Sequence, residues 1–115
     1  SPNMSCTTRI KLVRGDTGPQ LRFTLTSQVD YDPIDLTNAT VTLHFREEGS
    51  SSLLFSRQAN LIAPYTEGVA VIEWGATDLD QTPGYYEGEV EIVDNLGIRE
   101  TIYDVLKFEI REDFN

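Results

Sequence analysis

Two stretches of this sequence decide its fold: residues 39–46, which read ATVTLHFR, and residues 85–92, which read YYEGEVEI. In the first stretch, apolar residues occupy every odd position and polar residues occupy every even one. In the second stretch, Tyr86, Val90 and Ile92 alternate with three glutamates. Successive side chains of a strand point to opposite faces, so a period of two predicts antiparallel strands with one buried face. We therefore expect a scaffold of strands packed in two layers.

The same period extends along most of the chain on either side. Alternating segments are found at residues 8–13, 21–26, 69–74, 98–103 and 106–111. Their apolar faces predict one core that contains Phe23, Leu43, Trp74, Tyr86, Val90 and Phe108. Residues 75–80 could hold one short helical turn, with Thr77 as its cap. Seven to eight strands at near-regular spacing predict an all-β fold, either a sandwich or a small barrel.

Length and composition indicate one folded domain. The chain has 115 residues, of which 39% are hydrophobic and 24% are charged, as in ordinary folded proteins. We expect residues 4–115 to form a single β-sandwich domain. Residues 1–3 stand ahead of Met4 and read as the remnant of a cleaved expression tag.

The formal net charge of -10 at pH 7 argues against partners of negative charge. Nucleic acids and anionic membranes are bound through basic residues, so we expect neither as a partner. The acidity favours either solubility or the docking of a basic partner, and both remain open. Cys6 is the single cysteine, which excludes an intrachain disulfide. We recognise no apolar run of membrane-spanning length and no signal peptide.

Three carboxylates lie close together in a turn-rich segment. Asp30, Asp32 and Asp35 could supply oxygen ligands to a calcium ion. Acidic residues are also ordinary turn formers, and Pro33 stiffens the middle of the segment. We expect a turn here rather than a metal site.

Two further features could carry chemistry. Glu87, Glu89 and Glu91 share one strand face, where a glycosidase could place its paired carboxylates. We expect instead a solvated or partner-facing surface, on which the three groups repel one another and stay ionised. His44 is the single histidine, and without a second histidine or a reactive cysteine we expect it to be exposed or hydrogen-bonded. The sequence thus predicts no catalytic residue, no metal and no cofactor.

An ordered set of motifs resembles a known family. The motifs are Val13-Arg14-Gly15-Asp16, Leu21-x-Phe23-x-Leu25, Ile34-Asp35-Leu36-Thr37-Asn38-Ala39-Thr40-Val41, Gly84-x-Tyr86 and Lys107-Phe108-x-Ile110. Gly84-x-Tyr86, at the start of a late strand, is similar to the tyrosine corner of immunoglobulin-like sandwiches. Together the motifs cover nearly the whole chain after Met4 and resemble the N-terminal domain of tailed-phage baseplate upper proteins.

The resemblance implies an immunoglobulin-like antiparallel β-sandwich without a disulfide. Such a domain plugs into a baseplate or tail and can carry receptor-binding machinery. This chain ends at Asn115, before the long extension that contacts receptor-binding trimers in the family, so a small tail, neck or head-decoration protein is equally compatible. We expect a protein made in the bacterial host cytoplasm and built into the virion. Its expected partners are other virion proteins and copies of itself, as a homo-oligomer.

The expected function is assembly through protein–protein contacts, without enzymatic activity. Loops on a rigid sandwich usually carry the recognition residues. The candidate contact residues are Asp16, Thr17, Glu47, Glu48, Tyr65, Tyr85, Asn95 and Leu96. The main alternative is a carbohydrate- or receptor-binding adhesin module, marked by clustered exposed tyrosine, tryptophan and polar side chains. An enzyme would instead require a cleft that holds two of the acidic residues.

Overall fold

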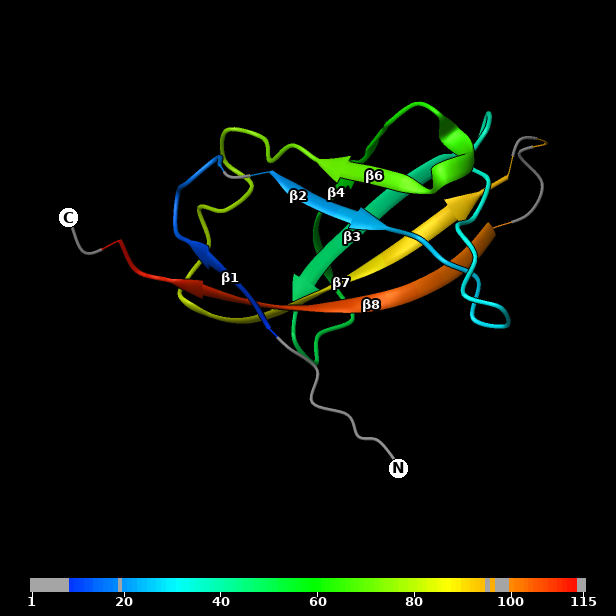
Figure 1. Ribbon diagram of the computed structural model, residues 1–115. Helices are drawn as coiled ribbons and strands as arrows, with labels where there is room; N and C mark the ends of the chain where they lie inside the picture. The colour runs from blue at the N-terminus through cyan, green and yellow to red at the C-terminus, as the bar shows by residue number, and fades with distance from the viewer. Residues whose placement is uncertain (1–8, 19, 95, 97–99, 114–115) are drawn as a thin grey trace.

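The computed structural model of the chain describes residues 9–18, 20–94, 96 and 100–113. These residues form two β-sheets that lie as two layers (Figure 1). The larger sheet has the strand order β1-β8-β7-β3-β4, and the smaller sheet has the order β2-β6-β5. The strands are β1 (Ile10–Val13), β2 (Leu21–Thr24), β3 (Thr40–Glu47), β4 (Leu53–Gln58), β5 (Asn60–Leu61), β6 (Val69–Ile72), β7 (Gly84–Val93) and β8 (Glu100–Arg111). The predicted all-β fold of two layers is confirmed.

One pair of strands departs from the predicted antiparallel arrangement. β1 and β8 run parallel, with Ile10 opposite Phe108 and Val13 opposite Arg111. The other strand pairs in the described part of the chain are antiparallel. Nearly the whole chain connects β1 to β8, so no short hairpin dictates their relative direction. The prediction was wrong for this pair.

β8 is one strand of 12 residues, where the sequence predicted two separate strands. Its register with β7 shifts between Val90 and Glu91, which leaves Tyr103 as an extra residue on β8. The Tyr103 hydroxyl donates to the carbonyl oxygen of Thr26 at 2.8 Å and accepts from the Thr26 N–H at 2.9 Å. These two hydrogen bonds tie the larger sheet to the chain just beyond β2 in the smaller sheet.

The core between the sheets is aromatic at its centre. The ring centroid of Phe45 lies 5.4 Å from that of Tyr86 and 5.2 Å from that of Phe108. Gly88 faces the same space, because a Cβ atom added there would lie 2.6 Å from the Cδ1 atom of Leu43. The glycine therefore makes room for Leu43 at the middle of β7.

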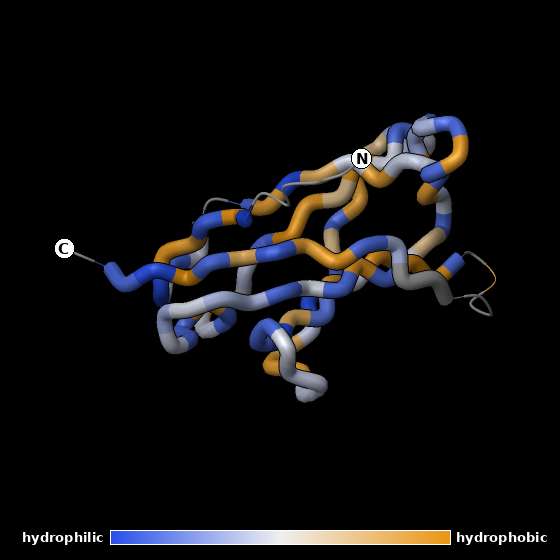
Figure 2. The backbone as a smooth tube through the Cα atoms, turned by 90° about the horizontal axis from the view of Figure 1, so that it is seen from below, coloured by the Kyte–Doolittle hydropathy of each residue, from blue (hydrophilic) through white to orange (hydrophobic). Residues whose placement is uncertain are grey.

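The predicted core residues are buried with one exception. Phe23 is only partly buried, because β2 is an edge strand of the smaller sheet. Figure 2 shows apolar and polar positions alternating along the strands, as the period of two predicts. The fully or almost fully buried members are Leu43, Trp74, Tyr86, Val90 and Phe108.

Residues 76–79 form turns, not the short helical turn that residues 75–80 could have held. The Asp78 carboxylate accepts from the Gly75 N–H at 2.6 Å and from the Arg57 guanidinium at 2.6 and 2.8 Å. This carboxylate closes the segment as a turn and holds it against β4. The helical element in the described part of the chain is a 3-10 helix, η1 (Tyr65–Glu67). Among these residues, no helix has the length and apolar character needed to cross a bilayer.

Candidate functional site

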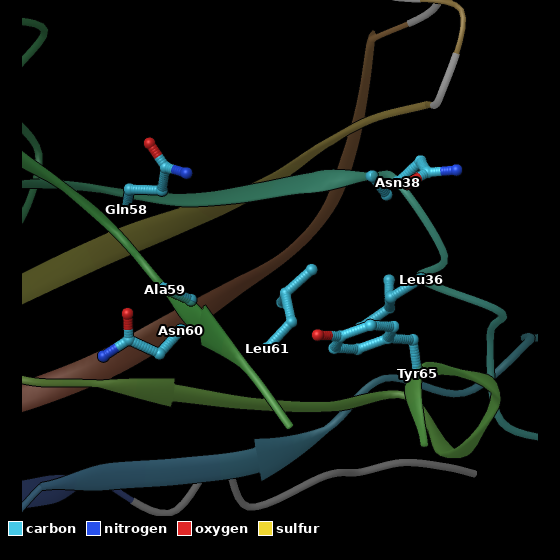
Figure 3. Close-up of a pocket in the computed structure, with 8 residues that line it drawn as sticks. Leu36, Asn38, Gln58, Ala59, Asn60, Leu61 and Tyr65 are labelled. Atoms are coloured by element: carbon cyan, nitrogen blue, oxygen red, sulfur yellow. The ribbon is translucent and has the colours of Figure 1, made fainter. Parts of the chain in front are cut away.

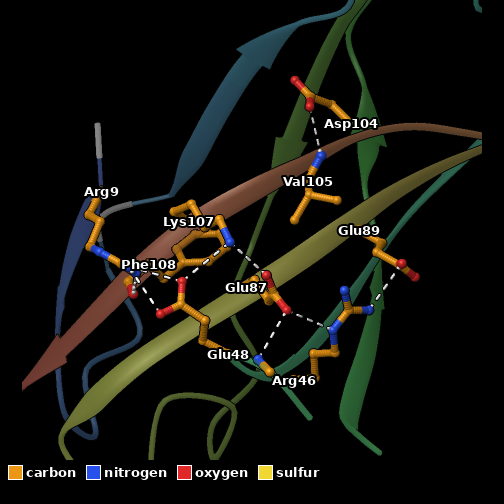
Figure 4. A network of polar contacts seen from close by, with 10 residues as sticks. Arg9, Arg46, Glu48, Glu87, Glu89, Asp104, Val105, Lys107 and Phe108 are labelled. Atoms are coloured by element: carbon orange, nitrogen blue, oxygen red, sulfur yellow. Dashed lines mark hydrogen bonds and ion pairs between the residues drawn. The ribbon is translucent and has the colours of Figure 1, made fainter. Parts of the chain in front are cut away.

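A set of linked ion pairs covers the outer face of the larger sheet and is called the outer-face network below (Figure 4). Glu87 on β7 lies at its centre. Its carboxylate accepts from Lys107 Nζ at 2.8 Å, from Arg46 Nε at 3.1 Å and from the Gly49 N–H at 3.3 Å. These donors come from β8, from β3 and from the tip between β3 and β4, so Glu87 joins three parts of one sheet.

The expected surface was either solvated or partner-facing, and for Glu87 the solvated alternative was wrong. The residue is only 8% exposed. The hydrogen bond from Lys107, helped by the Gly49 N–H and Arg46, lowers the pKa of Glu87 to about 2 against the opposing effect of burial. Glu89 is also paired, with its Oε2 atom 3.0 Å from Arg46 Nη1. Cations between the carboxylates offset the repulsion that the sequence suggested.

The network continues to the end of the sheet through Glu48. Its Oε2 atom lies 2.9 Å from Arg9 Nη2 and 3.2 Å from Lys107 Nζ. The Arg9 guanidinium carbon in turn lies 4.4 Å from the ring centroid of Tyr85. The Glu48 N–H donates to the Tyr85 carbonyl oxygen at 3.1 Å. Two of the predicted contact residues, Glu48 and Tyr85, are therefore neighbours in one cluster.

The predicted contact residues divide between the two ends of the larger sheet. At one end, Glu47 pairs with Tyr86 at the last position of β3. At the other end, Thr40 pairs with Val93, so Leu96 in the following hairpin lies there, exposed. An eight-residue strand spans roughly 25 Å, so a single small partner would not touch both ends. Asn95 lies outside the described residues.

The remaining predicted contact residues fall on separate loops. Asp16 and Thr17 follow β1, where the Thr17 N–H donates to the Asp16 carboxylate at 3.1 Å. Tyr65 lies in η1 and is 43% exposed. Its carbonyl oxygen accepts from the Leu36 N–H at 3.0 Å, which places it beside the chain that leads into β3. The structure therefore does not bring the seven described candidates together into one surface.

The acidic segment forms local turns, as predicted. The Asp30 carboxylate accepts from the Asp32 N–H at 3.1 Å. The Asp35 carboxylate accepts from the Thr37 hydroxyl at 2.6 Å and from the Thr37 N–H at 2.9 Å, and these bonds lower the pKa of Asp35. Within the described ranges, no three metal-ligating side chains gather into one group.

Sequence reasoning missed a contact between a serine, the histidine and a glutamate on the outer face. His44 Nδ1 lies 2.6 Å from Ser56 Oγ, and His44 Nε2 lies 2.8 Å from Glu91 Oε1. An ionised carboxylate only accepts, so Nε2–H donates to Glu91, whereas the donor between Nδ1 and the Ser56 hydroxyl depends on the protonation of the imidazole. Ser56 stands directly opposite His44 on β4, and this pairing could have been found only from the register of the hairpin.

A pocket of about 390 Å³ opens where the chain crosses from β4 in the larger sheet to β5 in the smaller one (Figure 3). We call it the crossover pocket. Its apolar lining consists of Leu36, Ala39, Ala59 and Leu61, and its polar lining of Asn38, Gln58, Asn60 and Tyr65. Of these residues, the sequence singled out only Tyr65 as a contact. The other seven come from two chain segments, residues 36–39 and 58–61, which only the strand order brings together.

Comparisons with known proteins add no family assignment. No protein-family model matches the chain, and no curated protein matches its sequence significantly.

Proposed function

We propose that this chain is a non-enzymatic structural protein of a phage tail or baseplate, where it holds neighbouring virion proteins together. The motifs that resemble the N-terminal domain of baseplate upper proteins are the origin of this proposal. The observation that carries it is the placement of one motif, Gly84-x-Tyr86. The Tyr86 hydroxyl donates to the carbonyl oxygen of Thr82 upstream. This is the hydrogen bond that a tyrosine corner makes in immunoglobulin-like sandwiches.

The strand order supports the same immunoglobulin-like arrangement. β3, β7 and β8 adjoin in one sheet, as strands C, F and G do in that fold, and β2, β6 and β5 adjoin as strands B, E and D do. Gly88 stands two residues after Tyr86, at the position where antibody domains carry a cysteine. Leu43 and Phe108 occupy the space beside it. Side chains of the two adjacent strands thus fill the space next to the position of the antibody cysteine.

We place the assembly contact at the β3–β4 end of the larger sheet, called the hairpin end below. It comprises Glu47, Glu48, Leu53, Leu54 and Tyr85. Leu53 and Leu54 are 50% and 42% exposed, and Tyr85 is 55% exposed. Exposed leucines and a tyrosine beside charged groups are typical of surfaces that bind another protein. Glu48 pairs with Arg9 and Lys107 beside this surface, and groups that are held in place before binding lose less entropy on binding.

The proposal is tested in particles of the phage or prophage whose genome encodes this chain. We expect mass spectrometry of purified particles to detect the chain in a fixed ratio to the other tail proteins. Crosslinking should connect the hairpin end to a neighbouring virion protein or to a second copy of the chain. Leu54→Asp, which places a charge in the contact, should reduce incorporation strongly.

A matched control separates contact from folding. Val29 is 91% exposed, in a turn outside the hairpin end, so Val29→Asp should leave incorporation unchanged. Both variants should unfold at the temperature of the original protein, because neither side chain is buried. Absence of the chain from mature particles would reject the proposal. Equal incorporation of the two variants would reject the hairpin end as the contact.

A further inference from the structure

We propose that the crossover pocket is a binding site for a neutral carbohydrate. This inference goes beyond the assembly role and does not depend on it. The pocket volume of about 390 Å³ lies within the range of roughly 300–1,000 Å³ that small-molecule sites occupy. That size suits one or two sugar rings.

The polar groups of the pocket have no partner within the described part of the chain. The side-chain amides of Asn38, Gln58 and Asn60 make no hydrogen bond to another described residue, and neither does the Tyr65 hydroxyl. Figure 3 shows Gln58 and Asn60 on one side of the pocket and Asn38 on the opposite side. Each amide offers both a donor and an acceptor, which is the combination that sugar hydroxyls require.

The apolar lining matches the other chemical feature of a sugar, the C–H face of its ring. The Tyr65 ring lies beside Leu36 and Leu61 in Figure 3, and Tyr65 is 43% exposed. Aromatic side chains present a large apolar area together with a polar end. A sugar ring stacked against Tyr65 would therefore place its hydroxyls near the surrounding amides.

Hydrogen bonds, a strand pair and a close backbone contact hold the backbone around the pocket. The Leu36 N–H donates to the Tyr65 carbonyl oxygen at 3.0 Å, and Leu36 is fully buried. Gly68 ends η1 with a φ of 71°, at a point where an added Cβ would lie 2.6 Å from the Leu25 carbonyl oxygen. On the other side, Leu61 pairs with Ala70 in the smaller sheet. A preformed site loses little entropy on binding.

The absence of charged side chains from the pocket lining favours an uncharged ligand. All eight lining residues are neutral, so a cationic ligand finds no carboxylate in the pocket and an anionic one finds no cation. The net charge of -10 additionally repels anions from the whole molecule. A neutral sugar needs no counter-charge in the pocket and is not repelled by the net charge. Its hydroxyls can hydrogen-bond to the amides while its ring packs against Tyr65.

The direct test is a nuclear magnetic resonance titration of the full, ¹⁵N-labelled chain. The probes are glucose, galactose, N-acetylglucosamine, lactose and cellobiose, with glucuronate as a charged comparison. We expect at least one neutral sugar to shift the side-chain NH₂ signals of Asn38, Gln58 and Asn60. Glucuronate should bind more weakly than glucose. The inference is overturned if no neutral sugar shifts these signals, or if glucuronate binds as tightly as glucose.

Variants then locate the site. Tyr65→Ala should weaken binding of the responding sugar about tenfold, because it removes the aromatic surface. Tyr31→Ala, which alters a tyrosine that is 76% exposed and lies outside both the pocket and the hairpin end, should leave sugar binding unchanged. If Tyr65→Ala fails to fold, Asn60→Ala alters an exposed side chain of the same pocket and should also weaken binding. Unchanged binding in a folded pocket variant overturns the inference and leaves the assembly proposal standing.

Discussion

The outer-face network and the crossover pocket are both rich in polar side chains, but they differ in how these side chains are paired. In the network, the single carboxylate of Glu87 accepts hydrogen bonds from three different residues. In the pocket, the amides of Asn38, Gln58 and Asn60 have no hydrogen-bond partner among the described residues. Paired groups hold the sheet together, whereas unpaired groups remain available to a ligand.

This difference predicts where substitutions change stability and where they change binding. The network and the core beneath it should control the free energy of unfolding. The pocket and the hairpin end should control interactions with other molecules at little cost in stability.

The largest effect is expected in the core beneath the network. Leu43→Ala or Phe108→Ala should lower the free energy of unfolding by about 2–5 kcal/mol, because each leaves a cavity next to Gly88. Tyr65→Ala in the pocket should change it by less than about 0.5–1 kcal/mol. Urea denaturation followed by Trp74 fluorescence measures all three. Equal losses in the core and pocket variants would contradict the division.

Removing the central charge of the network should have the next largest effect. Glu87→Gln should cost about 2 kcal/mol, because it weakens hydrogen bonds to Lys107 and Arg46 at a position that is only 8% exposed. Glu89→Gln is the matched control. Its side chain is 31% exposed and, among the described residues, forms an ion pair with Arg46 alone, so the loss of its charge should cost well under about 1 kcal/mol. Similar urea midpoints for the two variants would show that Glu87 has no special role.

The network should also make the free energy of unfolding depend on pH. The pKa of Glu87 is lowered from 4.5 to about 2 in the folded protein, so folding favours the ionised form. The contribution of this ionised group to the free energy of unfolding is therefore complete above pH 4.5, and it is lost as the pH falls toward 2. Urea midpoints measured across this interval should fall more steeply for the original protein than for Glu87→Gln. Parallel curves would mean that other carboxylates account for the acid sensitivity.

The fold was predictable where the period of two was strict. In β3, the apolar residues Val41, Leu43 and Phe45 are all buried, because a strand with one apolar face has only one way to face the core. The pairing of β1 with β8 was not predictable in the same way. Its parallel direction depends on contacts between the two ends of the chain, which alternation does not encode.

The candidate sites were less predictable because they depend on register. Tyr65 was identified from its type alone, but its neighbours Leu36 and Leu61 come from segments that meet only after the sheets form. The burial of Glu87 was missed for the same reason. Its partners Lys107 and Arg46 stand directly opposite it on the two adjacent strands. Alternation assigns a residue to a face, and the strand order then decides what it contacts.

The smallest effect is expected for Ser56→Ala, and this variant tests whether the chain is an enzyme. Ser56, His44 and Glu91 have the residue types that a nucleophile, a general base and an orienting carboxylate would use, and they lie within hydrogen-bond distance of one another in that order. Ser56 is nevertheless exposed on an edge strand, where water is not excluded from a reaction. We therefore expect a cross-strand hydrogen bond whose loss costs about 0.5–1 kcal/mol.

The corresponding assay compares p-nitrophenyl acetate hydrolysis by the original protein, Ser56→Ala and the surface control Val29→Asp. All three should hydrolyse the ester at the same slow rate, and a fluorophosphonate probe should not label Ser56. The reason is that hydrolysis by a serine requires donors arranged around the developing oxyanion as well as a base. Hydrolysis or labelling that disappears only in Ser56→Ala would show that the outer face is catalytic. That result would overturn the proposal that this chain acts only through binding.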